Sequence, residues 1–507
     1  MGNGTDIIKM SMEVWVTMSK KTKKEGWIVP GGEKLAMIFG AGSTQTMNTF
    51  VQTFLSLYIL MVGISPGVAA VVLLILKGWD AINDMIFGFM VDKYRFKPGK
   101  NKFTKWLFSG RYMPWFRILF MAIPVGTVIL FTINTGMPMW VRVAQYCLGY
   151  FLYDFGMTVT GVYNLLPLSV TNNFDERNFI LSWNGLGQGF GSLPVVFLGT
   201  VMIAGSTGYA GAAVIFSLFG MVLAIIPAIF VKERNTAEIN PEAQEKYTVK
   251  EMLKTLKQVP ELILLLIGVL LWGIFYTGGY GLFVSYYIFD DANLSIILTL
   301  LAVIPTIILV PLLPVIFKKV DKIVVARITC SVFAIAGILI CVLGADFLKA
   351  NIGILYLLSA LQGMSYSLTM FACFQLTPDL AEMARFRTGR DVGGIVAASY
   401  NFVTKLVGSL VSSVTLLILG IYGFVSVEAN SFDELAAMNA RGEGLQTARA
   451  LEGLWNVSYL FPLIGFGAAA VAFFFVKIKR EDIKVYMEVN SGQITREEGE
   501  ALLEKAK

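Results

Sequence analysis

Apolar residues run along this chain in long blocks that are separated by short polar segments. A helix needs about 20 apolar residues to cross the hydrocarbon core of a bilayer. A transmembrane β-barrel would instead show segments of about 10 residues in which apolar and polar positions alternate. The pattern therefore predicts an all-α polytopic membrane protein with twelve transmembrane helices, at about residues 35–62, 67–91, 113–134, 138–167, 182–205, 209–231, 258–286, 293–318, 322–344, 352–378, 393–423 and 453–477.

A charged stretch divides these helices into two groups of six, which predicts two similar bundles with pseudo-twofold symmetry. Along the chain we expect polar cytoplasmic segments before the first bundle, between the two bundles and after the second. The predicted parts are an N-terminal segment of residues 1–34, a first bundle of residues 35–231, a cytoplasmic linker of residues 232–257, a second bundle of residues 258–477 and a cytoplasmic tail of residues 478–507.

Lys and Arg gather in the loops on one side of the predicted bundles. Residues 93–111 hold seven of them and the linker holds six, whereas the first, third and fifth loops hold none. Basic loops face the cytoplasm in helical membrane proteins. We therefore expect a multi-pass protein of the cell membrane, plasma or inner, with both termini in the cytoplasm. This orientation accounts for the net charge of +6, so no nucleic-acid partner is expected.

The composition excludes a soluble enzyme. Of the 507 residues, 56% are hydrophobic and only 15% are charged, whereas roughly 25% of the residues in a soluble domain are charged. The sequence has no histidine, which excludes His-based acid–base catalysis and His-ligated metals. We expect no enzymatic activity and no cofactor except a coupling cation.

Ionisable residues within the second predicted helix need an explanation, because each costs at least about 2.5–3.5 kcal/mol at the bilayer centre. Lys77, Asp80 and Asp84 occupy positions i, i+3 and i+7, which lie on one helical face. Asn83 adds an amide oxygen. So few hard oxygen donors suit a monovalent ion, which predicts a site for Na⁺, Li⁺ or H⁺ at Asp80, Asp84 and Asn83. A static salt bridge between Lys77 and Asp80 is the alternative.

Two further charges fall within apolar helices. Lys405 lies a dozen residues into the eleventh predicted helix, which predicts a buried cation. Asp80, Asp84 and Lys405 sum to −1, so one bound monovalent cation would neutralise them and couple ion binding to movement. A structural pair of Lys405 with one aspartate is the alternative. Asp154 in the fourth helix has three open interpretations: a third acid in the cavity, an acceptor for sugar hydroxyls, or an interfacial residue near Arg142.

The sequence Trp79-Asp80-Ala81-Ile82-Asn83-Asp84 resembles the second-helix signature of the glycoside–pentoside–hexuronide:cation symporters, the melibiose permease branch of the major facilitator superfamily. Further matches follow in the order of that family over about residues 34–478. They are Gly88, Asp92-Lys93, Pro167, Asp175-Glu176-Arg177, Asp379, Arg387-Thr388-Gly389-Arg390, Gly394-Ile395 and Lys405.

The resemblance implies two six-helix bundles, alternating access, and symport of a sugar or glycoside with Na⁺, Li⁺ or H⁺. It also implies a cation site at Asp80 and Asp84, with Lys405 close by and with Lys405 and Lys77 as coupling residues. The residues that hold a galactoside in that family are not kept: Gln45, Val159 and Asn184 replace two acids and an arginine. We therefore expect a different sugar, and we include an acidic one such as a hexuronide as a hypothesis.

Polar and aromatic residues in the helices are the candidates to bind such a substrate, through hydroxyl hydrogen bonds and ring stacking. They are Gln45, Tyr153, Asp154, Thr160, Asn164, Trp183, Asn184, Tyr400 and Asn401. Two other functions remain open: the same mechanism with a lysolipid or another organic anion as cargo, and a membrane sensor that does not transport.

Charged residues at the predicted cytoplasmic helix ends have two possible roles: they belong to solvated loops, or they form a gate that latches helix ends together. They are Asp92, Lys93, Arg95, Arg177, Asp379, Glu382, Arg387 and Arg390, and a gating role for most of them rests on the resemblance. The loop of residues 424–452 is expected to lie outside as a small lid. Alternating glycines at 185, 187, 189 and 191 predict close helix packing or local bending. Thr495 with Glu498 has the spacing of a capping box, which predicts a short helix at residues 495–506.

Overall fold

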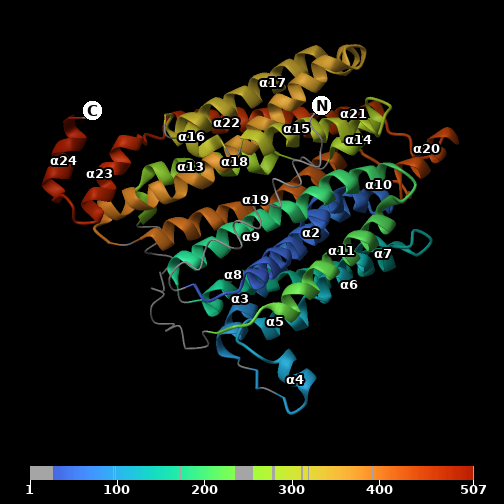
Figure 1. The fold of residues 1–507 in the computed structure, drawn as a ribbon. Helices are drawn as coiled ribbons and strands as arrows, with labels where there is room; N and C mark the ends of the chain where they lie inside the picture. Colours follow the sequence, from blue (N-terminus) through green and yellow to red (C-terminus); the bar gives the residue numbers. More distant parts are fainter. Residues whose placement is uncertain are drawn as a thin grey trace, which may run out of the picture.

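The computed structural model describes residues 27–94, 96–97, 99–171, 173–234, 255–276, 280–309, 312–317, 319–390 and 392–505. This described part is helical throughout and contains no β-strand, apart from an isolated antiparallel bridge between Val62 and Glu428. Figure 1 shows long helices that run side by side, with the two ends of the sequence colour scale on opposite sides of the bundle. We refer to residues 27–234 as the N-terminal half and to residues 255–505 as the C-terminal half.

Helices of the N-terminal half follow the predicted apolar blocks closely. They are α2 (Gly31–Met61), α3 (Pro66–Lys93), α4 (Lys102–Leu107), α5 (Met113–Leu119), α6 (Ala122–Phe131), α7 (Met139–Met157), α8 (Val159–Val170), α9 (Phe174–Pro194), the π-helical segment η1 (Val195–Gly199), α10 (Thr200–Ala204) and α11 (Gly208–Phe230).

Helices of the C-terminal half also follow the predicted apolar blocks. Further helices lie in the loop of residues 424–452 and in the tail. Its elements are α13 (Pro260–Phe275), α14 (Gly281–Tyr287), α15 (Leu294–Leu309), α16 (Leu313–Ile316), α17 (Lys322–Ala350), α18 (Ile352–Thr388), α19 (Gly393–Ile421), α20 (Phe432–Ala440), α21 (Ala448–Trp455), the π-helical segment η5 (Asn456–Leu460), α22 (Phe461–Phe474), α23 (Arg480–Asn490) and α24 (Arg496–Lys505).

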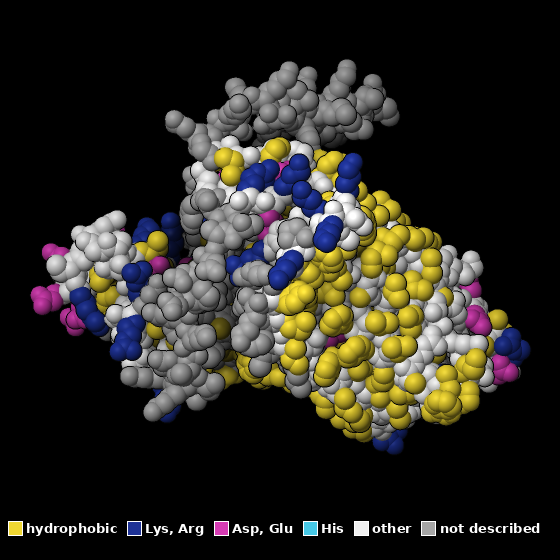
Figure 2. All heavy atoms as spheres, turned by 90° about the horizontal axis from the view of Figure 1, so that it is seen from below, with side chains coloured by type: hydrophobic (Ala, Val, Ile, Leu, Met, Phe, Trp, Pro, Cys, Tyr) yellow, Lys and Arg dark blue, Asp and Glu magenta, His cyan; other side chains and the backbone are white. Residues whose placement is uncertain are grey.

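Each of the twelve predicted apolar blocks contains helix in the described residues, and several blocks are broken into two or three pieces. Seven helical stretches in the described part are long and apolar enough to cross a membrane on their own. Figure 2 shows a broad, nearly continuous hydrophobic surface on one face, which suits contact with lipid. The all-α membrane fold is thus confirmed, and the number of twelve crossings stays a prediction.

Two glycines with positive φ mark breaks in the helices of the C-terminal half, and α18 extends ten residues beyond the predicted end of its span at residue 378. Gly344 has φ 76° and interrupts α17 where the ninth predicted span ends. Gly389 has φ 66° and ends α18 in the left-handed conformation, which residues with a Cβ atom adopt at a cost. At the other end of the chain, Thr495 and Glu498 form the predicted capping box: the Thr495 amide donates to the Glu498 carboxylate at 2.9 Å and the Glu498 amide to the Thr495 hydroxyl at 3.3 Å.

Helices α2 and α9 cross in direct backbone contact. A Cβ atom built on Gly191 would lie 2.1 Å from the Gly42 carbonyl oxygen, and one on Gly187 would lie 2.5 Å from the Ile38 carbonyl oxygen. The Thr46 hydroxyl donates to the Gly191 carbonyl across this contact, at 2.9 Å. The close packing predicted from the alternating glycines is therefore confirmed for Gly187 and Gly191. Gly185 and Gly189 have open space around them.

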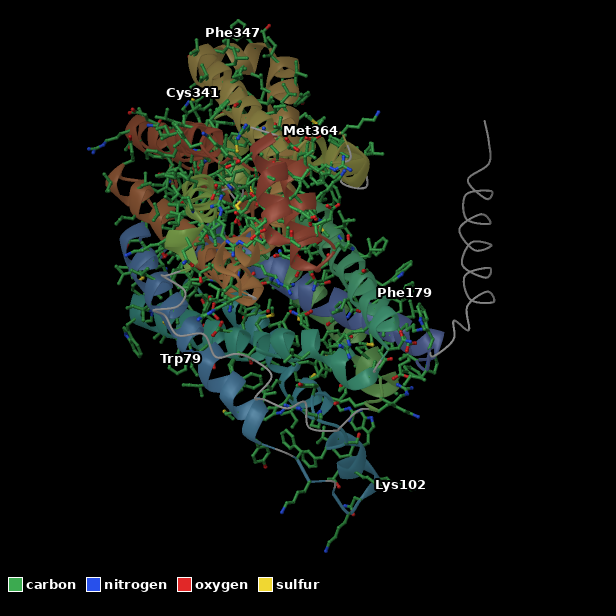
Figure 3. The ribbon with its side chains drawn as sticks, turned by 90° about the vertical axis from the view of Figure 1, so that its left-hand side faces the viewer. Trp79, Lys102, Phe179, Cys341, Phe347 and Met364 are labelled. Carbon is green, nitrogen blue, oxygen red and sulfur yellow. The ribbon has the colours of Figure 1, made fainter. Side chains whose placement is uncertain are left out.

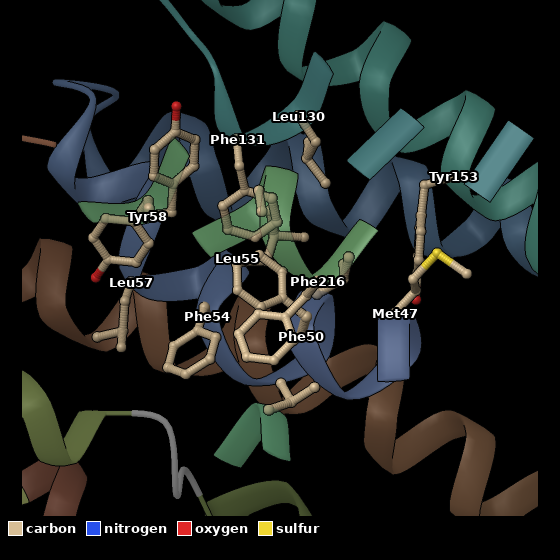
Figure 4. Packing of buried hydrophobic residues seen from close by; sticks show 14 of the residues in the cluster. Met47, Phe50, Phe54, Leu55, Leu57, Tyr58, Leu130, Phe131, Tyr153 and Phe216 are labelled. Atoms are coloured by element: carbon tan, nitrogen blue, oxygen red, sulfur yellow. The ribbon is translucent and has the colours of Figure 1, made fainter. Parts of the chain in front are cut away.

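Buried apolar side chains in the described part form two clusters. The first is centred on aromatic residues of the N-terminal half, where the rings of Phe50 and Phe131 lie 4.8 Å apart and those of Tyr58 and Phe131 lie 4.9 Å apart (Figure 4). It also includes residues 280–294, 336–358 and 416–459 of the C-terminal half. The second cluster draws only on the C-terminal half. The two halves therefore share apolar packing through one part of the C-terminal half.

Hydrogen bonds between the halves gather around the loop that joins α2 to α3. The Val427 and Ala429 amides donate to the Leu60 and Met61 carbonyls, both at 2.8 Å, and the Gly63 amide donates to the Val427 carbonyl at 2.9 Å. The segment of residues 424–430 therefore lies along the end of α2 almost as a short strand. We call this segment the external clasp, after the side on which its loop is predicted to lie.

The opposite end of the N-terminal half is held by the buried carboxylate of Glu176. It accepts hydrogen bonds from the Ile28 and Val29 amides at 3.1 and 3.0 Å and from the Thr171 hydroxyl at 2.7 Å. Lys34 forms an ion pair with it at 2.7 Å. Burial opposes ionisation of Glu176, but these hydrogen bonds outweigh it and lower the pKa below the ordinary value.

Replacement of Gly191 tests the α2–α9 contact. Gly191→Ala forces the two helices apart, and such overpacking costs about 1–3 kcal/mol, so we expect a lower thermal midpoint for the purified protein. Gly189→Ala is the matched control, because no atom lies within 4 Å of its Cβ position. Equal midpoints for the two variants would contradict the described crossing.

Glu176→Gln tests the carboxylate cluster through its pH dependence. Since the pKa is lowered in the fold, the stabilisation is complete above the ordinary pKa of a glutamate and is lost as the pH falls through the lowered value. We expect the variant to lose about 1.5–3 kcal/mol at neutral pH and to converge with the wild type in acid. The measurement is the thermal midpoint against pH, with exposed Glu500→Gln as control. A difference that does not change with pH contradicts the assignment.

Candidate functional site

The polar face of α3 packs against α7 through a buried amide and a buried carboxylate. Asn83 is 4% exposed and so is Asp154, and the Asn83 side-chain amide donates to the Asp154 carboxylate at 3.3 Å. A contact between the second and fourth predicted helices is thereby established. The side chain of Asp154 thus lies inside the helix bundle, and its three interpretations stay predictions.

Lys77 belongs to the same cluster and lies on α3 one turn before Asp80. It interacts electrostatically with Asp80 and with Asp154, and its ammonium group lies 5.6 Å from the centre of the Tyr150 ring on α7. Asp80 and Lys77 are both half-buried. The described members of the cluster thus carry two negative charges and one positive charge, arranged between two helices. In a low-dielectric interior such charges hold one another in place.

Asp84 belongs to α3, where its backbone lies one turn beyond Asp80, but its side chain is outside the described residues. The same is true of the side chains of Asp92 and Lys93, and Arg95 lies outside them altogether. Among the described residues no group of three or more His, Cys, Asp or Glu is placed to hold a metal ion. The predicted ion site at Asp80, Asp84 and Asn83 therefore stays a prediction.

Lys405 differs from the expectation of a buried cation. On α19 the positions 394, 397, 398, 401, 402, 405 and 408 are all exposed, and they form one helical face that includes Asn401 and Lys405. The hydropathy of a helix averages over its circumference, so the sequence does not reveal which face is left uncovered. Tyr400 points the other way: it is buried, and its ring lies 6.4 Å from that of Phe374.

Side chains of α2 form a polar row that the sequence analysis recognised only at Gln45. The Gln45 side chain donates to the Thr49 hydroxyl at 3.1 Å, and the buried Tyr153 hydroxyl donates to the Asn48 side-chain oxygen at 3.1 Å. Gln52 also hydrogen-bonds to Tyr153. Positions 45, 48, 49 and 52 lie on one helical face, and this spacing of polar residues in an apolar helix was the signal that could have identified them.

The candidates on α8 and α9 form a separate group. Thr160 and Trp183 are half-buried, Asn184 is buried and Asn164 is exposed. The Thr160 hydroxyl and the Asn184 side-chain oxygen are buried and have no hydrogen-bond partner among the described residues. Trp183 stacks at 5.7 Å on Phe179, and Figure 3 places Phe179 well apart from Trp79 on α3.

Among the described residues, most of the charges at the predicted cytoplasmic helix ends have partners within their own half. Asp379 pairs with Lys322 at 2.7 Å, and Arg387 pairs with Glu261 at 2.6 Å. Glu382 accepts from the Asn490 side chain at 2.8 Å. Arg177 donates to the Thr171 carbonyl at 3.3 Å, and Arg390 is exposed. These contacts tie helix ends to the tail and to neighbouring helices, so in this conformation they do not latch one half to the other.

An ion pair between the halves lies instead at the external clasp. Arg142 on α7 pairs with Glu428, and its guanidinium also donates to the Val62 carbonyl at 3.0 Å. The Ser426 hydroxyl donates to the Ile64 carbonyl at 2.6 Å. The Tyr209 amide at the start of α11 donates to the Asn430 carbonyl at 2.9 Å. The loop expected to be a lid therefore binds the ends of α2, α7 and α11.

Known proteins with similar sequences and folds are transporters. Residues 36–480 match the family described as MFS/sugar transport protein. The isoprimeverose transporter of Lactiplantibacillus pentosus is 25% identical over 476 residues, which cover 90% of this chain and 91% of that protein. YagG of Escherichia coli (strain K12), a candidate glycoside/cation symporter, is 24% identical over 364 residues, which cover 68% of this chain and 72% of that protein.

A solved structure of the nucleoside transporter NupG shares the fold, with a TM-score of 0.54 and 13% identity, and the match covers 88% of this chain and all (100%) of that chain. The family consists of membrane transporters and not of enzymes. From the extent of the family match, the chain belongs to the MFS/sugar transport family, the glycoside–pentoside–hexuronide:cation symporters of the major facilitator superfamily.

Proposed function

We propose that this protein is a symporter that couples the movement of a sugar or glycoside to Na⁺, Li⁺ or H⁺. The observation that carries the proposal is the buried contact between Asn83 and Asp154, with Lys77 and Asp80 beside it. Acids within a membrane helix are costly and mark ion pathways in transporters. The names of the related proteins support the class of cargo and the use of a cation.

The cation site in this proposal consists of Asp80, Asp84 and Asn83, with Asp154 as a third acid contributed by α7. Asp80, Asp84 and Asp154 carry −3 and Lys77 carries +1; in this proposal the exposed face of α19 turns toward α3, so that Lys405 brings the formal sum to −1. One monovalent cation brings this sum to zero. A loaded site can then pass through the low-dielectric centre at a smaller electrostatic cost than an empty one, which makes movement depend on the ion.

The sugar in this proposal binds along the polar row of α2 and the facing side of α7. Gln45, Asn48 and Tyr153 present amide and hydroxyl groups there, and a ring beside hydrogen-bonding groups suits a sugar. The unpartnered oxygens of Thr160 and Asn184 are further acceptors for hydroxyl groups. Buried polar atoms generally have partners, so their lack of partners among the described residues favours a ligand as the missing partner.

A lysolipid or another amphipathic anion is the second candidate cargo, and one observation favours it. The exposed face of α19 places Lys405 next to Phe402, which is 65% exposed. A cation beside an uncovered apolar ring suits an anionic head group with an attached acyl chain. Competition in uptake decides between them: neutral glycosides compete for the sugar site, and lysophospholipids compete for a lipid site.

Alternating access in this proposal is the rocking of residues 35–231 against residues 258–477, with both termini in the cytoplasm. The external clasp then closes the outer side, because it joins the ends of α2, α7 and α11 to the C-terminal half. The ion pairs of Lys322 with Asp379 and of Arg387 with Glu261 both lie within the C-terminal half, which is compatible with a state in which the inner ends of the two halves are apart. Opening to the outside requires that the clasp hydrogen bonds break.

Asp80→Asn and Asp84→Asn test the cation site. We expect each variant to weaken cation-dependent uptake on the order of 100-fold or more, because the loss of one partner leaves the remaining charges unbalanced. The measurement is uptake into proteoliposomes of a panel of radiolabelled neutral glycosides and hexuronides, under imposed gradients of Na⁺, Li⁺ and H⁺. Asp433→Asn in the external loop is the control. Coupled uptake that survives in both variants contradicts the proposal.

A reversible cross-link tests the external clasp. Val62 and Glu428 are partners in an antiparallel bridge, so their Cα atoms are about 4.5–5.5 Å apart, within the range of a disulfide. We expect Val62→Cys combined with Glu428→Cys to stop uptake on oxidation and to regain it on reduction. Each single variant controls for loss of the native side chain. Unchanged uptake by the fully cross-linked protein overturns the gating role.

A further inference from the structure

Helix α4, residues Lys102–Leu107, lies outside the helix bundle. None of its six described residues is buried. In Figure 1 it is set off to the side of the ends of α3 and α5, and in Figure 3 Lys102 lies at the tip of this projection. Within the described part of the chain, no packing partner accounts for the composition of its outer face.

The side chains that α4 exposes are basic and aromatic. Lys102 and Lys105 are exposed, as are Lys97 and Lys100 before the helix. Phe103 is 66% exposed, and its ring lies 5.7 Å from that of Trp106. No Asp or Glu occurs from residue 93 to residue 153. Glu233, a carboxylate that reaches this region from after α11, is engaged by the backbone amides of residues 111–113.

The position of α4 is fixed by contacts behind it. The Arg117 guanidinium on α5 donates to the Trp106 carbonyl and, at 3.2 Å, to the Ser109 carbonyl, and it lies 4.7 Å from the centre of the Trp106 ring. It also donates to the Ala228 carbonyl near the end of α11, at 2.9 Å. The ring of Phe96 stacks on that of Phe108 at 5.4 Å. The basic and aromatic face is therefore presented in a fixed orientation relative to the bundle.

Lysines beside exposed aromatic rings at the level of the helix ends match the chemistry of a membrane interface. Aromatic rings insert at the boundary between head groups and acyl chains, and each lysine near an anionic surface adds attraction. Figure 2 shows Lys and Arg side chains gathered at the margin of the broad hydrophobic face. We propose that Lys97 and residues 99–106 form an interfacial anchor that binds the anionic head groups of phospholipids in the adjoining leaflet.

Amide hydrogen exchange of the full-length protein in lipid nanodiscs tests the anchor without reference to transport. We expect the α4 amides to exchange more slowly in discs that contain phosphatidylglycerol than in discs of phosphatidylcholine alone. Since each lysine near such a surface contributes about fivefold in binding, Lys102→Gln combined with Lys105→Gln removes most of the difference. Lys479→Gln combined with Lys484→Gln, which removes the same charge from the tail region, leaves it unchanged.

Two further measurements keep the result decisive if the double variant folds poorly. In the wild type, high salt reduces the effect of phosphatidylglycerol, because head-group attraction is screened. Phe103→Ser weakens protection in both lipid compositions but retains the dependence on lipid charge. Identical exchange of the α4 amides in both lipid compositions overturns the proposal. It is also overturned if the tail control variant, Lys479→Gln with Lys484→Gln, reduces the difference between lipid compositions as much as the α4 double variant does. Either result leaves a solvated basic loop.

Discussion

The cost of charge in the membrane interior is the constraint on which the rest of this structure depends. Lys77 and Asp80 on α3 and Asp154 on α7 form a cluster that Asn83 completes with a hydrogen bond. None of these groups is tolerable alone in such a medium. Their opposite charges attract one another and so hold α3 and α7 together. The cluster keeps a net negative charge, which would favour binding of a cation. If the proposed site binds an ion, the binding of ion and cargo is coupled, and each strengthens the other by the same factor.

The proposed rocking of one half against the other depends on the contacts between them. Apolar packing joins the N-terminal half to residues 280–294, 336–358 and 416–459, while a second core holds the rest of the C-terminal half together. The external clasp adds directional hydrogen bonds and the pair of Arg142 with Glu428. In the proposed rocking the hydrogen bonds of the clasp break, whereas the close glycine crossing of α2 and α9 lies within the N-terminal half and need not change.

Local patterns in the sequence predict the helices well, because apolar blocks and the Thr495 capping box act within a few residues. They also place Lys77 near Asp80. Local patterns could not identify Asp154 as the partner of Asn83, because the sequence was compatible with three different environments for Asp154. The bridge of Val62 with Glu428 joins residues far apart in the chain, and nothing local encodes it. Lys405 was misplaced because hydropathy does not distinguish the faces of α19.

The most direct test of the account is equilibrium cation binding by the purified protein in detergent, followed as the shift of the thermal midpoint. For the wild type we predict a rise with Na⁺ or Li⁺, or with added protons, and none with the bulky cation choline at the same ionic strength. We predict that Asp80→Asn abolishes this selective rise while the protein stays folded. A wild type that responds alike to every cation, or a variant that keeps the full response, would contradict an ion site built on the α3 acids.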